Sequence, residues 1–170
     1  VHQYTSLNDP GGIGQKYWAF STSGVNMGLV TQYQGRQLPG PLTLVQHDFT
    51  WAQNATLNSY VASTLSTADP GQAYQAQKKV NQTVDQYGNV TQVQNFNYGN
   101  LTTPARTNDY YYVASGSFTS RYIFNRLNNA NVSEGGVTKT LITNTYGTTV
   151  GYGSFARPTS VQTLQGTRTF

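Results

Sequence analysis

Cysteine is absent from this sequence, and charged residues are scarce, since they make up 9% of its 170 positions. The absence of cysteine excludes disulfides, thiolate zinc sites and cysteine nucleophiles, and it leaves the redox compartment open. With so few charges, solubility depends on neutral hydrogen-bonding side chains rather than on electrostatic repulsion. We therefore expect the chain to associate readily with copies of itself.

Long apolar runs and dense basic clusters are also missing. No stretch is long and apolar enough for a membrane-spanning helix, and residues 1–20 do not resemble a secretion leader, so we expect no membrane insertion. Ten Lys and Arg outnumber six Asp and Glu, but the cations are spread singly apart from Lys78 and Lys79. Because a nucleic-acid surface needs clustered cations near aromatic residues, we expect no nucleic-acid partner.

Groups suited to catalysis are few and poorly placed. Four of the six carboxylates lie beside Pro, Gly or Asn, which favours a role in closing turns. Neither His2 nor His47 belongs to a metal-ligand spacing, and His47 and Asp48 would point to opposite faces of a strand. No nucleophile elbow or phosphate loop is present. The sequence therefore predicts a non-enzyme, with no catalytic residue, no metal and no cofactor.

The sequence does contain a repeated pattern of strand, tight turn and strand. Its clearest copy is residues 84–91, VDQYGNVT, in which Asp85, Tyr87, Gly88 and Asn89 form the expected turn. An Asp side chain can bond to the backbone two residues on, while Gly and Asn tolerate the positive φ of tight turns. The flanking segments alternate β-branched and polar residues, as half-buried strands do. This unit is predicted to be a β-hairpin.

Weaker copies of the pattern follow downstream. Residues 96–101 contain Tyr98, Gly99 and Asn100, residues 122–127 read YIFNRL, and a bare pair remains at Tyr146 and Gly147. A second hairpin is predicted from residues 130–133 and 137–143, with Gly135 and Gly136 in the turn between them. Because an isolated hairpin is marginally stable in water, these units are expected to pair edge to edge in a larger sheet.

The repeated pattern resembles the YD repeat of the RHS (rearrangement hotspot) family. In that repeat an aromatic-Asp pair is followed by any two residues, then by Gly, then by either Asn or Arg, and then by an aliphatic residue. Val84 stands where the family has Tyr, the second copy is one residue short, and Asn125 replaces Gly in the third. The resemblance covers mainly residues 80–150. It implies an extracellular or cell-surface setting, and a part in a hollow β-shell around a cargo domain or in a surface interaction protein.

Two regions can be distinguished without a sharp linker between them. Residues 1–76 are expected to form a turn-rich β region, because they contain Asp-Pro-Gly and Pro-Gly-Pro sequences, which favour turns. Residues 77–170 form the region of YD-repeat-like hairpins, and the two regions are expected to make one continuous β segment. Strands are expected at residues 15–21, 27–33, 42–51 and 109–113. Residues 55–65 have helical spacing, but their Thr, Ser and Val content favours a strand.

The fold class predicted is all-β, with repeated antiparallel hairpins in an extended or curling sheet and little or no helix. The chain begins at Val1 rather than at a methionine, and we expect it to be a segment of a larger protein or a processed subunit. Five Asn-x-Ser/Thr sequons also occur, and several are expected by chance in this composition; they are at Asn54, Asn81, Asn89, Asn100 and Asn131.

Aromatic clusters provide the remaining candidates for binding. Trp18, Trp51 and Tyr111 are possible stacking residues for sugar rings, which would make the chain a carbohydrate or cell-surface binding module. The other interpretation is that these rings pack in a wall or against a neighbouring chain. We favour a structural β-repeat segment that builds a shell wall or a filament through strand-edge pairing, with other copies or neighbouring repeats as partners.

Overall fold

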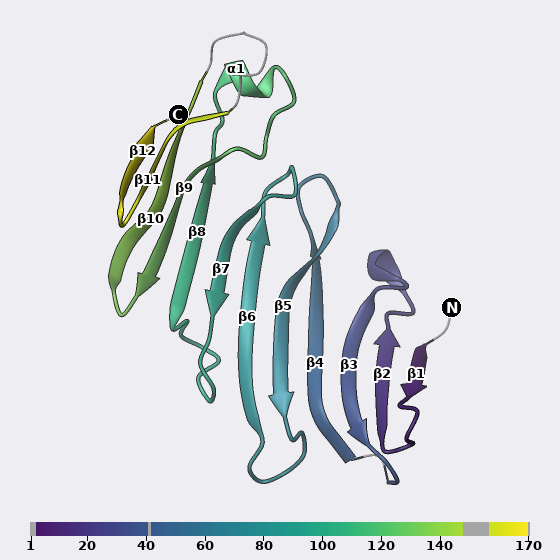
Figure 1. Cartoon of the computed structure of the whole chain (residues 1–170). Coiled ribbons are helices and arrows are strands. Elements are labelled where there is room, and N and C mark those ends of the chain that lie inside the picture. The colour runs from purple at the N-terminus through teal and green to yellow at the C-terminus, as the bar shows by residue number, and fades with distance from the viewer. Residues whose placement is uncertain (1–2, 41, 148–156, 170) are drawn as a thin grey trace. The chain divides into compact units, whose positions relative to one another are not determined.

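The computed structural model describes residues 3–40, 42–147 and 157–169. Its two helices are short, since η1 (Gly24–Asn26) has three residues and α1 (Gly116–Thr119) has four. The strands are β1 (Tyr4–Asn8), β2 (Gly14–Phe20), β3 (Val30–Gln37), β4 (Leu42–Gln53), β5 (Ser59–Ala68), β6 (Ala76–Val84), β7 (Val90–Asn95), β8 (Arg106–Tyr112), β9 (Leu127–Glu134), β10 (Val137–Tyr146), β11 (Pro158–Thr163) and β12 (Gly166–Thr169) (Figure 1).

The sheet order follows the chain order from β1 to β12, so strands that follow one another in sequence lie side by side. Neighbouring strands such as β4 and β5, or β9 and β10, run antiparallel. Short connections allow only this arrangement, because parallel neighbours need a long crossover. The prediction of an all-β fold built from antiparallel hairpins, with little helix, is confirmed.

Contacts divide the chain into two compact units. Unit 1 contains residues 1–82 and 95–104, and unit 2 contains residues 83–94 and 105–170. These bounds differ from those of the two regions distinguished in the sequence, residues 1–76 and 77–170. The reason is that β6 and β7 each contribute residues to both units.

Glycine turns are found where the sequence predicts hairpins. Gly135 and Gly136 have φ of 57° and 79°, which are the left-handed values that a two-residue hairpin turn requires. Gly88 has φ of 86° in the turn between β6 and β7. The alternating β-branched segments on either side of these turns supply the strands.

Few side chains are fully buried in either unit. The buried apolar residues among the described part of the chain are Phe96, Phe118 and Ala130, at 7%, 2% and 4% exposure. Most strand residues are half-buried, and every residue of β1 is exposed. A sheet in an ordinary domain packs one face against a second layer. Here the strands belong to one ordered series of neighbours, and no second sheet is present in the described residues.

Several element boundaries differ from those predicted. The strand expected over residues 55–65 is confirmed from Ser59 onward, whereas residues 55–58 lie in a turn in which Asn54 Oδ1 accepts hydrogen bonds from the Thr56 and Asn58 amides. Residues 122–127 do not form a hairpin: Tyr122 has φ of 58°, and β9 begins only at Leu127. This segment belongs to a loop that carries α1, which the repeat pattern did not indicate.

Candidate functional site

The predicted turn at residues 85–89 is closed by the side chain of Asp85. Its Oδ1 accepts hydrogen bonds from the backbone N–H groups of Tyr87 at 2.8 Å and Asn89 at 2.9 Å. Its Oδ2 accepts a third bond, at 2.9 Å, from Asn89 Nδ2. Asp85, Tyr87, Gly88 and Asn89 are therefore brought together as the sequence predicted.

The same turn also holds a distant loop of unit 2. The second hydrogen of Asn89 Nδ2 is directed at the carbonyl of Phe124, 2.8 Å away. The rings of Tyr87 and Phe124 stack with centroids 3.8 Å apart and an interplanar angle of 4°. Sequence reasoning missed this role, because a turn asparagine looks the same in sequence whether or not its side chain reaches another segment. Asn89 Nδ2 donates both bonds, so glycosylation at this sequon, which replaces one of its two hydrogens, would remove at least one of them.

The other predicted turn residues have mixed outcomes. In the turn after β7, Gly99 has φ of 77° and Asn100 Oδ1 accepts bonds from the Thr102 and Thr103 amides. Tyr146, in contrast, is the last residue of β10 and not a turn residue, so its prediction as part of a repeat turn is wrong. Its hydroxyl donates to the Leu127 carbonyl at 2.8 Å. Gly147 follows it, and the next residues lie outside the described part of the chain.

One face of unit 1 carries a row of aromatic side chains. Trp18, Tyr33 and His47 follow one another across β2, β3 and β4, with ring centroids 5.6 and 5.8 Å apart. Trp18 and Trp51, which were predicted as stacking residues, line the same hollow of about 290 Å³ on this face. Its other lining residues are Val30, Tyr33, Phe49 and Val61. Trp51 Nε1 donates to the Val30 carbonyl at 2.7 Å, which leaves a lining of largely apolar surface.

The opposite face of unit 1 carries a row of amide and charged side chains. Gln34 Nε2 donates to Gln32 and Gln46, each at 2.8 Å, and Gln46 in turn donates to Asp48. At the other end of the row, Arg36 donates to Gln34, and its guanidinium lies 4.0 Å from the centroid of the Tyr17 ring. The signal for this row was present as Gln32-Tyr33-Gln34 and Gln46-His47-Asp48, where period two places polar and aromatic residues on opposite faces.

His47 and Asp48 take part in different rows, as their adjacency on a strand predicts. The His47 ring stacks on Tyr33, and its Nδ1 lies 2.8 Å from Ser66 Oγ. The Asp48 carboxylate accepts hydrogen bonds from Gln32 and Gln46 on the other face. The two side chains therefore do not form an oriented acid-base pair.

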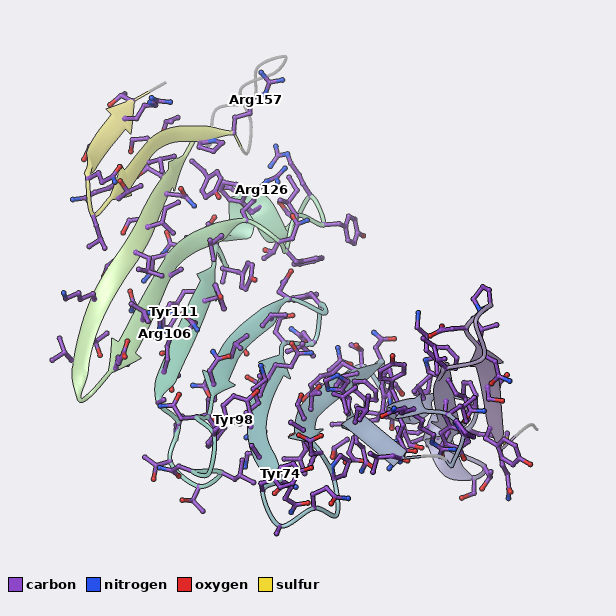
Figure 2. All side chains as sticks on the ribbon, turned by 60° about the horizontal axis from the view of Figure 1, so that its bottom comes forward. Tyr74, Tyr98, Arg106, Tyr111, Arg126 and Arg157 are labelled. Atoms are coloured by element: carbon purple, nitrogen blue, oxygen red, sulfur yellow. The ribbon has the colours of Figure 1, made fainter. Side chains whose placement is uncertain are left out.

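Tyr111, the third predicted stacking residue, lies in unit 2 and is half exposed (Figure 2). It lines a hollow of about 460 Å³. The other lining residues are Asp85, Gln86, Tyr87, Thr91, Tyr110, Tyr112, Val113, Ala114, Thr119 and Phe124. The Tyr112 hydroxyl donates to the Val90 carbonyl at 3.0 Å. The pKa of Tyr112 is raised, mainly because the hydroxyl is buried. Electrostatic interactions with Asp85 and with Tyr110 raise it further.

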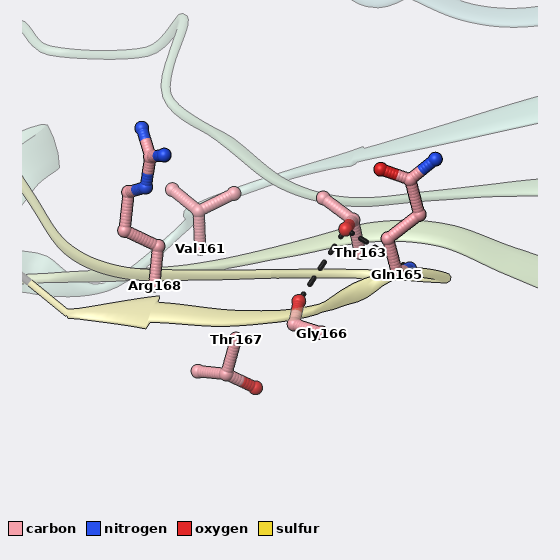
Figure 3. Close-up of a pocket in the computed structure, with 6 residues that line it drawn as sticks. All are labelled: Val161, Thr163, Gln165, Gly166, Thr167 and Arg168. Carbon is pink, nitrogen blue, oxygen red and sulfur yellow. Dashed lines mark hydrogen bonds between the residues drawn. The ribbon is translucent and has the colours of Figure 1, made fainter.

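The first and last strands of the series have one neighbour each. β1 carries no charged residue and no proline, and all five of its residues are exposed. β12 carries Arg168, which lies opposite Val161 of β11 and lines a shallow hollow of about 380 Å³ with Thr163 and Gln165 (Figure 3). Thr163 Oγ1 lies 3.3 Å from the Gly166 carbonyl at the turn. The two edges thus differ in charge.

The carboxylates are dispersed over turns and strands. Among the residues that the structure describes, no three His, Asp or Glu side chains gather as a metal site would require. Within the same described residues, neither helix is long or apolar enough to cross a membrane. The sequence matches no protein-family model and no curated protein.

Proposed function

We propose that this chain is a non-catalytic structural segment of an extracellular or cell-surface protein of the RHS or YD-repeat type. It contributes strands to a shell wall or to a self-assembling filament, and it does so by pairing its strand edges with neighbouring repeats or other copies. The setting is taken from the resemblance of residues 80–150 to the YD repeat.

The observation that carries this proposal is the small number of buried side chains. Three buried apolar residues in the described part of the chain are far fewer than a globular domain of this length buries. The aromatic row and the amide row occupy opposite faces of unit 1, and both are half-buried. Such a sheet gains stability when other surfaces cover it, as in a wall of repeated hairpins.

The edge strand β1 is suited to pairing. Natural proteins protect exposed edges with lysine, proline or bulges, and β1 carries neither residue type. The Asp9 amide donates to the Gly14 carbonyl and the Phe20 amide to the Gln3 carbonyl, so odd-numbered residues direct their backbone groups at β2. The N–H groups of the even-numbered residues of β1 therefore point away from the sheet.

The substitution Ser6→Pro tests edge pairing directly. Proline removes an outward N–H without removing a bond to β2, and Ser6→Ala is the matched control because it keeps the N–H. The proposal expects wild-type and Ser6→Ala chains to form large particles in light scattering, and Ser6→Pro to form smaller ones. Equal particle mass for all three proteins, at equal far-ultraviolet circular dichroism, would show that this edge is not used.

A carbohydrate-binding module is the second candidate function, and it is favoured by the convergence of Trp18 and Trp51 on one hollow. Sugar rings stack on such aromatic faces, but their hydroxyls also need polar partners. The apolar lining of this hollow offers few of them, so we rank this function second. Glycan binding by a monomeric chain, lost in both Trp18→Ala and Trp51→Ala, would reverse that ranking.

A further inference from the structure

The hollow of unit 2 differs in chemistry from the hollow of unit 1. Five of the eleven described residues that line it are aromatic, and one of the eleven, Asp85, carries a formal charge. No lysine or arginine is among these lining residues. Tyr87 and Tyr111 are each 50% exposed, so part of each ring is accessible to a ligand.

The aromatic side of the hollow is held in place before any ligand arrives. The backbone N–H of Tyr87 donates a hydrogen bond to the Asp85 side chain, which closes the turn. The Tyr87 ring stacks on the Phe124 ring, with centroids 3.8 Å apart. Asn89 ties the Phe124 carbonyl to the same turn. Tyr112 is held by its bond to the Val90 carbonyl. A preorganised site loses less conformational entropy on binding than a mobile one.

Elsewhere in the chain, aromatic rings already have cations as partners. Arg36 lies 4.0 Å from the Tyr17 ring centroid, and Lys79 lies 4.3 Å from that of Phe96. The face of an aromatic ring carries negative potential, so cations are drawn to it. The hollow of unit 2 presents rings of the same types together with a carboxylate, and its described lining residues include no lysine or arginine.

The electrostatic environment of two tyrosines supports a negative potential in this hollow. Besides burial, the charge of Asp85 and the effect of Tyr110 raise the pKa of Tyr112, which lines the hollow. Tyr146 does not line it; burial raises the pKa of Tyr146 too, but there the positive charge of Arg126 opposes the increase. The two hydroxyls thus experience charges of opposite sign.

We propose that the hollow formed by Asp85, Tyr87, Tyr111 and Phe124 is a binding site for a small organic ammonium ion. The aromatic faces contact the alkyl groups of the ion, and the carboxylate balances its charge. This inference goes beyond the proposed structural role and is independent of it. The Asp85 carboxylate in the lining would repel an anionic ligand.

Ligand-observed saturation-transfer NMR on the full chain tests this site, because the method tolerates weak binding and large particles. The probe is choline, and the matched control is 3,3-dimethylbutan-1-ol, which has nearly the same shape without the charge. We expect saturation transfer to choline and several-fold weaker transfer to the neutral alcohol. Methyl glucoside serves as a third probe, for a sugar site.

Substitutions locate the bound ion. Tyr87→Leu and Tyr111→Leu should each weaken choline binding about 3- to 30-fold, the range that cation–π contacts span between exposed and desolvated sites. Asp85→Asn should weaken it as well, while keeping an acceptor for the Tyr87 and Asn89 amides. Tyr98→Leu, at an exposed tyrosine in unit 1, is the matched control and should leave binding unchanged.

Three results would overturn the proposal. Equal binding of choline and the neutral alcohol would make the hollow merely apolar, and binding of methyl glucoside without choline would make it a sugar site. Unchanged choline binding in Tyr111→Leu, whose far-ultraviolet circular dichroism reports whether it folds, would place the ion elsewhere.

Discussion

The side chain of Asn89 connects the turn after β6 to the loop before β9, and its replacement tests how much that connection contributes. Asn89→Ala removes the bonds to Asp85 Oδ2 and to the Phe124 carbonyl, of 2.9 and 2.8 Å. At about 0.5–1.5 kcal/mol for each hydrogen bond, the free energy of unfolding should fall by about 1–3 kcal/mol.

Asn89→Asp should be more damaging, although the two side chains have nearly the same shape. A carboxylate at this position cannot donate, and it would face both the Asp85 carboxylate and the Phe124 carbonyl. Two like charges 3 Å apart repel by about 1.4 kcal/mol even in water. We therefore expect the Asp variant to be about 1–2 kcal/mol less stable than the Ala variant.

Urea unfolding followed by circular dichroism measures both differences. Asn125→Ala, at an exposed asparagine in the same loop, is the control and should change stability by less than about 0.5 kcal/mol. The reasoning would be refuted if Asn89→Asp were as stable as wild type, or if Asn89→Ala and Asn125→Ala were indistinguishable.

Three other perturbations have defined outcomes. The pKa values of Tyr112 and Tyr146 are raised above 10.0, so the folded state keeps protons that the unfolded state releases, and stability should be lost as the pH rises above 10. Tyr112→Phe should lessen that loss in an alkaline circular dichroism titration, and an unchanged titration would contradict this. Trp51→Phe removes the bond to the Val30 carbonyl and should cost about 0.5–1.5 kcal/mol in urea unfolding, whereas equal stability would contradict it. Gly136→Ala forces a side chain into left-handed φ and should cost about 1–2 kcal/mol, which an unchanged melting temperature would disprove.

Local patterns predicted the hairpins well because their causes are local. Glycine at Gly135 and Gly136 permits positive φ, and alternating residues on either side favour strands, so the β9–β10 hairpin follows from a dozen consecutive residues. The strand from Ser59 was predicted for the same reason. The strand prediction for residues 55–65 was wrong only over residues 55–58, which lie in the turn that Asn54 closes.

Contacts between distant segments could not be predicted in the same way. The bond from Asn89 to Phe124 spans 35 residues, and nothing in the short motif around Asn89 encodes it. Tyr146 was predicted to be a turn residue because Gly147 follows it, but it pairs with Pro158 of β11, and its ring lies 6.1 Å from that of Phe118 between centroids; the short motif encodes neither contact. Trp18 and Trp51 were singled out by residue type, and only the strand register showed that they share a hollow.

The most direct test of the central claim is the particle mass of the purified chain over a range of concentrations, by light scattering together with negative-stain electron microscopy. Edge pairing predicts masses well above the 18.6 kDa of one chain, rising with concentration, and fibres or large particles in the images. A uniform species of 18.6 kDa at every concentration would contradict it.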